Sequence, residues 1–291
     1  MKRLLALLLA SIFVLSSFVL TACEMPKKTN ESEITRYIPV KAELTCPKGI
    51  FAITLDFGEN NLLLRETKLQ FGKIIETVEF IYDSNNKNTK ALQKSSDGEV
   101  FSITENTYDS NGMLIKTAFK DGNGLTQIIT QREYDSKGQL KVVDSRALGS
   151  QSSKNIYSYD DNGNLISVIQ IAHDGSTNTE KYTYDSNGKL IERTIGDQIF
   201  TYTYDSDGKL IKVTGPGLFV SSNLEENSTY DLTYDTNGNI TKIIVTNDIN
   251  EKYIYTFEYK EVTIPQEMIE TDINISIESL YLDLAGIIAL Q

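Results

Sequence analysis

The stretch that decides the fold is Tyr182-Thr183-Tyr184-Asp185-Ser186-Asn187-Gly188-Lys189-Leu190, with a close copy from Tyr202 to Leu210. Its centre, Tyr-Asp-x-x-Gly, recurs at intervals of 20 to 30 residues. The full copies are Tyr108, Asp109 and Gly112; Tyr134, Asp135 and Gly138; Tyr159, Asp160 and Gly163; Tyr184, Asp185 and Gly188; Tyr204, Asp205 and Gly208; and Tyr234, Asp235 and Gly238. Self-similarity at such a period indicates a repeat architecture, in which each copy is one supersecondary unit.

The chemistry of each copy is that of a turn. An Asp carboxylate accepts backbone N–H groups two residues on, and Gly adopts the left-handed conformation without steric cost. Because an aliphatic residue follows two positions after each Gly, the motif predicts a β-hairpin with a bulge. In the central copy we expect Tyr184 opposite Leu190 and Thr183 opposite Ile191, an aromatic–aliphatic pairing that stabilises the hairpin.

Further turn-type clusters lie between the repeated motifs. They are Lys120 to Gly124, His173 to Ser176, Ile195 to Gln198 and Asn247 to Asn250. Each period therefore contains two strands and two turns. The prediction is an all-β fold: an antiparallel β-hairpin repeat domain over residues 41–264, with YD-like repeats at about 82–259.

Tyrosine pairs at i and i+2, such as Tyr182 and Tyr184, share one face of a strand. A sheet of over a dozen strands rarely stays open and flat, so we expect a curled or coiled meander that buries its Tyr/Leu face. Residues 265–291 depart from the repeat and are interpreted as a short C-terminal cap over the open end of the array.

The N-terminus has the features of a bacterial secretory signal. Lys2 and Arg3 precede an apolar run from Leu4 to Leu20, and small residues precede Cys23. Leu-Thr-Ala-Cys at residues 20–23 resembles a lipobox, which implies a signal peptide at 1–22 and a lipoprotein whose Cys23 carries palmitate-like acyl chains. Residues 23–40 are then the lipidated Cys and a flexible tether, and the expected location is the cell envelope, anchored to a membrane outside the cytoplasm.

The net charge of the chain limits the kinds of partner that we expect. The net charge is −12, and removal of residues 1–22 takes away Lys2 and Arg3, so −12 − 2 gives −14 for the mature chain. An acidic field repels nucleic acid, which excludes it as a direct partner. Cys46 has no second cysteine to pair with once Cys23 is lipidated, and it is interpreted as a buried structural thiol.

The repeated segment Tyr182 to Leu190 resembles the YD repeat of Rhs and wall-associated proteins. The resemblance spans about Tyr82 to Tyr259. It implies strands that spiral into a shell, associated with carbohydrate binding or with the enclosure of a toxin. This sequence lacks the self-cleaving core and the toxin domain of the large members, so the hairpin architecture carries over and the encapsulating role does not.

Chemistry-bearing residues are few. The Asp-rich turns at Asp160 to Gly163 and Asp205 to Gly208 invite a calcium interpretation, but Asx-turn chemistry explains each Asp, so no metal site is predicted. His173 is the one histidine and lies in a turn. No residue set forms a convincing catalytic site, and the chain is predicted to be neither an enzyme nor a cofactor protein.

Two functions therefore stay open. The first is a membrane-anchored surface binding module for carbohydrate or cell-wall glycan, since exposed Tyr ladders beside Asp and Asn suit sugar rings. The alternative is a structural scaffold that docks another envelope protein. A glycan-active enzyme ranks below both, because nothing marks one carboxylate pair among 40 acidic residues.

Overall fold

The described part of the chain is entirely β-structure. The computed structural model describes residues 33–47, 49–59, 61–149, 152–216 and 227–265. Within these ranges there are 18 strands and no helix, and hence no helix long and apolar enough to cross a membrane. The strands are β1 (Glu33–Cys46), β2 (Gly49–Phe57), β3 (Leu63–Gln70), β4 (Lys73–Tyr82), β5 (Asn88–Ser95), β6 (Val100–Tyr108), β7 (Leu114–Asp121), β8 (Thr126–Tyr134), β9 (Leu140–Ala147), β10 (Ser152–Tyr159), β11 (Leu165–Ile171), β12 (Thr177–Tyr184), β13 (Leu190–Ile195), β14 (Gln198–Tyr204), β15 (Leu210–Pro216), β16 (Asn227–Tyr234), β17 (Ile240–Asn247) and β18 (Lys252–Pro265).

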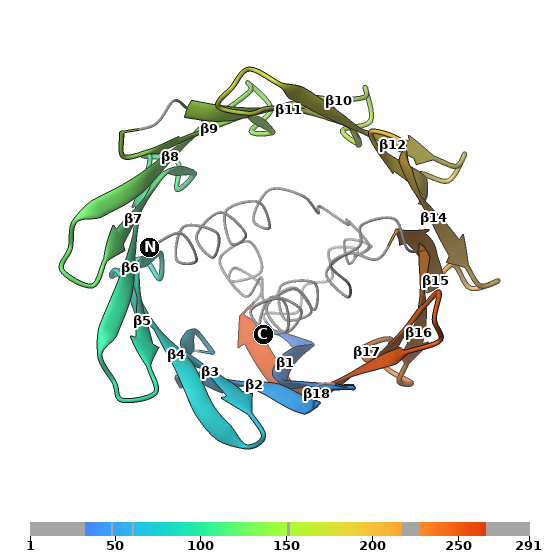
Figure 1. Ribbon diagram of the computed structural model, residues 1–291, viewed down its shortest axis with the longest axis horizontal. Coiled ribbons are helices and arrows are strands. Elements are labelled where there is room, and N and C mark those ends of the chain that lie inside the picture. Colours follow the sequence, from blue (N-terminus) through green and yellow to red (C-terminus); the bar gives the residue numbers. More distant parts are fainter. Residues whose placement is uncertain (1–32, 48, 60, 150–151, 217–226, 266–291) are drawn as a thin grey trace.

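The strands form a closed ring (Figure 1). Each strand pairs antiparallel with its neighbours in the chain, and β1 pairs with β18 from Glu33 opposite Pro265 to Thr45 opposite Ile254. The predicted hairpin array is therefore confirmed, but the curled or coiled open sheet is wrong: the sheet closes into a barrel. Closure satisfies the backbone N–H and C=O groups that two free edges would leave unpaired.

Closure also moves the expected boundaries of the repeat domain. Residues 33–40 were expected to belong to a flexible tether, whereas they are the first half of β1 and pair with β18. The C-terminal cap predicted for residues 265–291 stays a prediction. Apart from Pro265, which ends β18, these residues lie outside the described ranges, as do the signal peptide and Cys23.

The repeated hairpin contains a bulge. Tyr184 lies opposite Leu190 as expected, but Thr183 lies opposite Glu192 and not Ile191. The register shifts at this step because one strand carries an extra residue, and the same shift precedes the tyrosine in the other copies of the motif. The bulge turns Leu190 toward the barrel interior while Ile191 is exposed.

The turns fall on two rims of the barrel. The turns that follow even-numbered strands form one edge, which we call the YD rim because those after β6, β8, β10, β12, β14 and β16 contain the Tyr-Asp-x-x-Gly motif. The turns that follow odd-numbered strands form the opposite edge, which we call the second rim. Because β1 runs toward the second rim and β18 runs away from it, the described chain enters and leaves at the YD rim.

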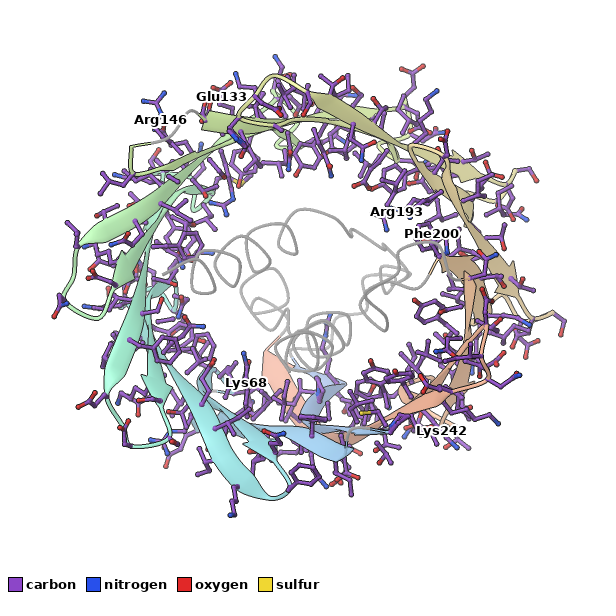
Figure 2. All side chains as sticks on the ribbon, in the orientation of Figure 1. Lys68, Glu133, Arg146, Arg193, Phe200 and Lys242 are labelled. Carbon is purple, nitrogen blue, oxygen red and sulfur yellow. The ribbon has the colours of Figure 1, made fainter. Side chains whose placement is uncertain are left out.

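Side chains alternate between an inner and an outer wall. Figure 2 shows Lys68, Arg193 and Phe200 pointing into the ring, and Glu133 and Arg146 pointing outward. Eighteen strands about 4.8 Å apart and tilted by about 40° make a ring about 35 Å across, too wide for wall side chains alone to fill.

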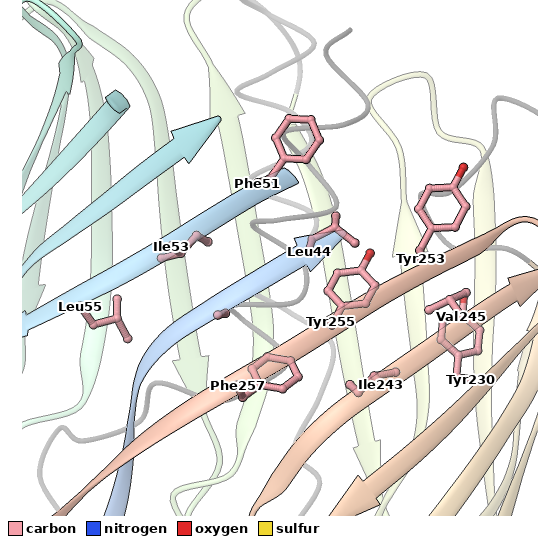
Figure 3. Close-up of a cluster of buried hydrophobic side chains, with 11 residues drawn as sticks. Leu44, Phe51, Ile53, Leu55, Tyr230, Ile243, Val245, Tyr253, Tyr255 and Phe257 are labelled. Carbon is pink, nitrogen blue, oxygen red and sulfur yellow. The ribbon is translucent and has the colours of Figure 1, made fainter. Parts of the chain in front are cut away.

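The main apolar cluster lies on the inner wall where the ring closes. It joins side chains of β1, β2 and β16–β18, among which Leu44, Phe51, Ile53, Val245 and Tyr255 are fully buried (Figure 3). Cys46 is half-buried and packs against this cluster. The apolar packing thus reinforces the β1–β18 pairing that closes the barrel.

Candidate functional site

Eight tyrosines form a belt on the inner wall near the YD rim. The hydroxyl of each donates to a backbone carbonyl one repeat earlier in the chain, over 2.6–2.9 Å. The donors and acceptors are Tyr82 to Leu63, Tyr108 to Asn88, Tyr134 to Leu114, Tyr159 to Leu140, Tyr184 to Leu165, Tyr204 to Leu190, Tyr234 to Leu210 and Tyr259 to Ile240. We call this set the tyrosine girdle. It connects successive hairpins through side chains as well as through the sheet.

Burial raises the pKa of six girdle tyrosines, Tyr134, Tyr159, Tyr184, Tyr204, Tyr234 and Tyr259. Burial raises the pKa of Tyr184, and the Asp160 carboxylate of the preceding turn raises it further. A neutral phenol is the hydrogen-bond donor that the carbonyl of Leu165 requires. The tyrosines expected to be exposed ladders are therefore inward-facing and half-buried, with their hydroxyls already engaged.

The Asp of each repeated motif organises the turn beside its tyrosine. In the central copy, Asp185 Oδ1 accepts the backbone N–H of Asn187 and of Lys189, both at 2.8 Å. The Gly188 N–H donates to the Asp185 carbonyl, and Gly188 has a φ of 79°. The N–H of Lys189 holds the pKa of Asp185 below its usual value. Asp185 Oδ1 is thus committed to the turn, and the described residues contain no cluster of three metal-ligating side chains.

The outer wall is charged along its strands. Glu79 on β4 pairs with Arg65 on β3 at 3.3 Å and with Lys94 on β5. The hydrogen bond from Lys94 lowers the pKa of Glu79.

The inner wall of β6–β10 is polar but lacks acids between the two rims. Opposite residues of paired strands share a face, so the buried Ser102, Thr117 and Thr130 fix which positions point inward. These inward positions are Ser102, Thr104, Asn106, Tyr108, Leu114, Thr117, Phe119, Ile128, Thr130, Arg132, Tyr134, Leu140, Val143, Ser145, Ala147, Ser153, Asn155, Tyr157 and Tyr159. Asp121, opposite Ser102, ends β7 and begins a turn of the second rim. In a chain of net charge −12, this sector of the wall has hydroxyls, amides and aromatic rings, and Arg132 as its charge.

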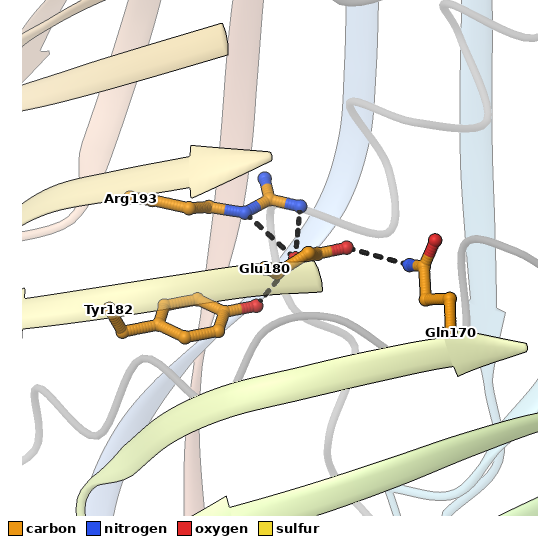
Figure 4. A network of polar contacts seen from close by, with 4 residues as sticks. All are labelled: Gln170, Glu180, Tyr182 and Arg193. Carbon is orange, nitrogen blue, oxygen red and sulfur yellow. Dashed lines mark hydrogen bonds and ion pairs between the residues drawn. The ribbon is translucent and has the colours of Figure 1, made fainter. Parts of the chain in front are cut away.

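A second inner-wall sector holds a buried ion pair (Figure 4). Arg193 on β13 donates to Glu180 on β12 through Nε at 3.0 Å and Nη2 at 2.8 Å. Tyr182 and Gln170 donate to the same carboxylate. Burial lowers the pKa of Arg193, but the facing Glu180 outweighs burial and raises it. Burial also raises the pKa of Tyr182, and Glu180 adds to that effect.

The second rim is apolar and acidic. The six large hydrophobic side chains that are at least 50% exposed all lie in its turns or in the adjoining strand ends. They are Phe71, Ile74, Leu125, Leu148, Ile199 and Ile249. The exposed acids Asp97, Asp174, Asp197 and Asp248 lie in the same turns. Exposed apolar groups gathered on one edge mark an interaction surface.

The sequence predicts the turns but not which charged side chains point to the inner wall. His173 lies exposed in the turn after β11, away from the inner wall. The inward direction of Glu180, Arg193 and Arg132 depends on the register of the bulged hairpins, which the sequence alone does not give. One signal was present: they follow the same alternation as the tyrosines, since Glu180 is two residues before Tyr182.

Comparison with known proteins was made at the levels of family, sequence and structure. A family model described as Teneurin YD-shell matches residues 50–196, which is about half of the chain. No curated protein sequence matches the chain.

Several solved structures contain a similar arrangement of strands. The crystal structure of TcdB2-TccC3-TEV is 18% identical, with a TM-score of 0.38 over 83% of this chain and 13% of that chain. The Photorhabdus luminescens Tc holotoxin pore is 18% identical, with a TM-score of 0.30 over 72% of this chain and 14% of that chain. A porin-like protein from Bacteroides uniformis is 14% identical, with a TM-score of 0.43 over 76% of this chain and 96% of that chain.

The girdle predicts a specific loss of stability. Tyr184→Phe removes the hydroxyl that donates to Leu165 and leaves a half-buried carbonyl without that donor. We expect the free energy of unfolding in urea to fall by about 1–2 kcal/mol. Tyr37→Phe is the control, because its hydrogen bond to Glu261 is exposed and should change stability by less than about 0.5 kcal/mol. Equal effects of the two substitutions would contradict a structural role for the girdle.

The buried ion pair between Glu180 and Arg193 predicts a larger loss of stability than the girdle does. Glu180→Gln leaves the Arg193 guanidinium buried without its counter-charge, and we expect the free energy of unfolding to fall by about 3–5 kcal/mol. The matched control is Glu79→Gln on the outer wall, which should cost at most about 1 kcal/mol. The double change Glu180→Leu with Arg193→Met should recover most of the loss, because it removes both buried charges. A double variant no more stable than Glu180→Gln would refute this explanation.

Proposed function

Because the chain belongs to the Teneurin YD-shell family, we propose that it is a lipid-anchored shell of the bacterial envelope that binds a carbohydrate chain along its inner wall. The β-barrel shell is its structure; the anchor and the ligand are the proposal. The chain spans about 13% of the length of the chain that it resembles in the TcdB2-TccC3-TEV structure.

The observation that carries the ligand proposal is the composition of the inner wall over β6–β10. Sugar recognition requires hydroxyl and amide side chains to bind the sugar hydroxyls and apolar ring faces to contact the sugar faces. The hydroxyl and amide groups are supplied by four inward-facing residues, Asn106, Thr130, Ser145 and Asn155. The ring faces are supplied by the tyrosines of the same strands. The absence of inward acids between the rims of these strands leaves the wall without the charge that would repel an acidic glycan.

The anchor proposal agrees with the direction of the chain. Cys23 is separated from Glu33, where β1 begins, by nine residues, which span at most about 30 Å when extended. Since β1 begins at the YD rim, a lipid on Cys23 would hold that rim toward the membrane. The second rim would then point away from it.

The second rim favours one other function, the docking of an envelope protein. Its exposed apolar side chains would pack against an apolar patch on a partner, and its exposed acids would pair with basic residues around that patch. The partner expected on this interpretation is a protein with a basic and apolar surface.

Lipid anchoring is tested by Cys23→Ala in the bacterial host. We expect the unchanged chain to fractionate with membranes and to incorporate labelled palmitate, and the variant to lose both properties. Cys46→Ala is the control, since Cys46 lies within the barrel and should leave both unchanged. Palmitate labelling that survives Cys23→Ala would rule out this anchor.

Carbohydrate binding is tested by co-sedimentation with purified cell-wall sacculi and a panel of insoluble polysaccharides. We expect saturable binding that a soluble glycan of the same kind competes away. Ser153→Glu places a carboxylate on the inner wall of β10 and should weaken binding, whereas Ser158→Glu on the outer wall of the same strand should not.

Two results would overturn the ligand proposal. They are no binding across the panel, and equal loss from the two Ser→Glu variants. In the first case, a single partner protein bound by the unchanged chain and lost on Leu148→Ser would favour docking at the second rim.

A further inference from the structure

One position of the repeat is usually aromatic or aliphatic but is charged in one copy. Two residues before the girdle tyrosine, the strand places an inward side chain in the middle of the wall. The occupants around the ring are Phe80, Asn106, Arg132, Tyr157, Tyr182, Tyr202, Leu232 and Phe257. Six of the eight are aromatic or aliphatic, and Arg132 is the charged exception. Departures from a repeat's own pattern are where functional residues are expected.

Arg132 is held at one corner of its guanidinium group. Its Nη1 donates to Thr117 Oγ1 at 2.9 Å, and Thr117 donates in turn to Asn106 Oδ1 at 3.0 Å. Asn106 is fixed by its Nδ2, which donates to the backbone and side-chain oxygens of Asn88 at 3.1 Å. This chain of hydrogen bonds across β5–β8 sets the direction of the guanidinium and uses one of its five N–H groups.

The charge of Arg132 has no counter-ion among the residues that the structure describes. Burial lowers the pKa of the half-buried guanidinium, and no carboxylate is among the groups that oppose this effect. An arginine nevertheless remains protonated. Glu133 and Asp144 on the neighbouring positions point to the outer wall.

Arg193 is a second inward-facing arginine of the barrel, and its environment differs from that of Arg132. Glu180 on the adjacent strand binds it through two hydrogen bonds and both side chains are buried. A buried cation without such a partner is unfavourable, because desolvation is not offset by an opposite charge. Arg132 has that unfavourable arrangement and remains half-buried, within reach of a ligand on the inner wall.

We propose that Arg132 is an anion-binding subsite of the inner wall, which takes the acidic group of a hydroxyl-rich polymer, in the first place the carboxylate of a uronic acid. The planar guanidinium suits a carboxylate with two parallel N–H donors. The neighbouring Asn106 and Thr117 suit the sugar hydroxyls, and Tyr134, two residues further along the same face of β8, supplies an aromatic ring. This inference rests on the proposed carbohydrate function and narrows its ligand to an acidic chain.

The test uses the full-length chain in mild detergent and titration calorimetry with three probes. They are an oligogalacturonate, the same oligomer with its carboxylates methyl-esterified, and a poly(glycerol phosphate). We expect the oligogalacturonate to bind more tightly than its ester, and Arg132→Gln to weaken that binding about 10- to 100-fold. The matched control is Arg146→Gln, which removes the same charge from the outer wall and should leave the affinity unchanged.

Folding of the variant is checked separately. The introduced glutamine carries no charge to desolvate and its amide can still donate to Thr117, so Arg132→Gln should melt at no lower temperature than the unchanged chain. A variant that melts lower is replaced by Arg132→Lys, which keeps the charge without the planar fork and should bind with intermediate affinity.

Each outcome decides between the two proposals. Equal loss from Arg132→Gln and Arg146→Gln overturns the subsite, because it shows a general charge effect. If acid and ester bind alike and Arg132→Gln changes neither, the inner-wall carbohydrate proposal stands and the subsite falls. Binding of the phosphate polymer alone, lost on Arg132→Gln, supports the anion site with phosphate as its source and overturns the carbohydrate proposal. No binding of any probe overturns both.

Discussion

The pairing of β1 with β18 is the interaction on which the rest of the structure depends. Eighteen strands can satisfy their backbone groups without free edges only if the first and last strands meet, and their long register from Glu33 to Thr45 achieves this. The largest apolar cluster lies behind the same seam, so burial and hydrogen bonding stabilise one joint. The remaining strands pair in sequence order, each with the strand before it and the strand after it in the chain. The ring therefore concentrates its long-range contacts in one place, while the pairing elsewhere is local.

Closure gives the two walls different chemistry. Outward positions carry ion pairs such as Arg65 with Glu79, which contribute little to stability individually. Inward positions carry the tyrosine girdle, where each hydroxyl is shared between successive repeats. The aromatic residues that make the repeat recognisable thus serve the shell itself, and the specificity of the inner wall lies in the positions that differ between repeats. Arg132 and Arg193 are two such positions with opposite arrangements, one without a carboxylate partner in the described part of the chain and one paired with Glu180.

Much of this fold follows from local chemistry and was predictable. Asp185 and Gly188 specify their turn whatever lies around them, and the i, i+2 tyrosines fix which face is shared. Closure was not predictable, because it depends on twist accumulated over all the strands and on two segments more than 200 residues apart. Residues 33–40 have no repeat pattern, so their place in β1 appears only with β18 beside them. The inner-wall charges were missed for a related reason: the one-residue bulge at each turn changes which of Leu190, Ile191 and Glu192 face inward.

The repeat also sets the rules by which such a ring can change size. Each copy contributes an up-strand and a down-strand, so gain or loss of one copy alters the circumference by two strands, or the diameter by about 4 Å. The strand number stays even, and both ends of the barrel chain stay on the YD rim. The girdle bond survives the change, because each tyrosine contacts the copy before it, whichever copy that is. Duplication of a repeat can therefore change the inner diameter of the barrel. The β1–β18 pairing and the rim at which the chain enters and leaves stay as they are.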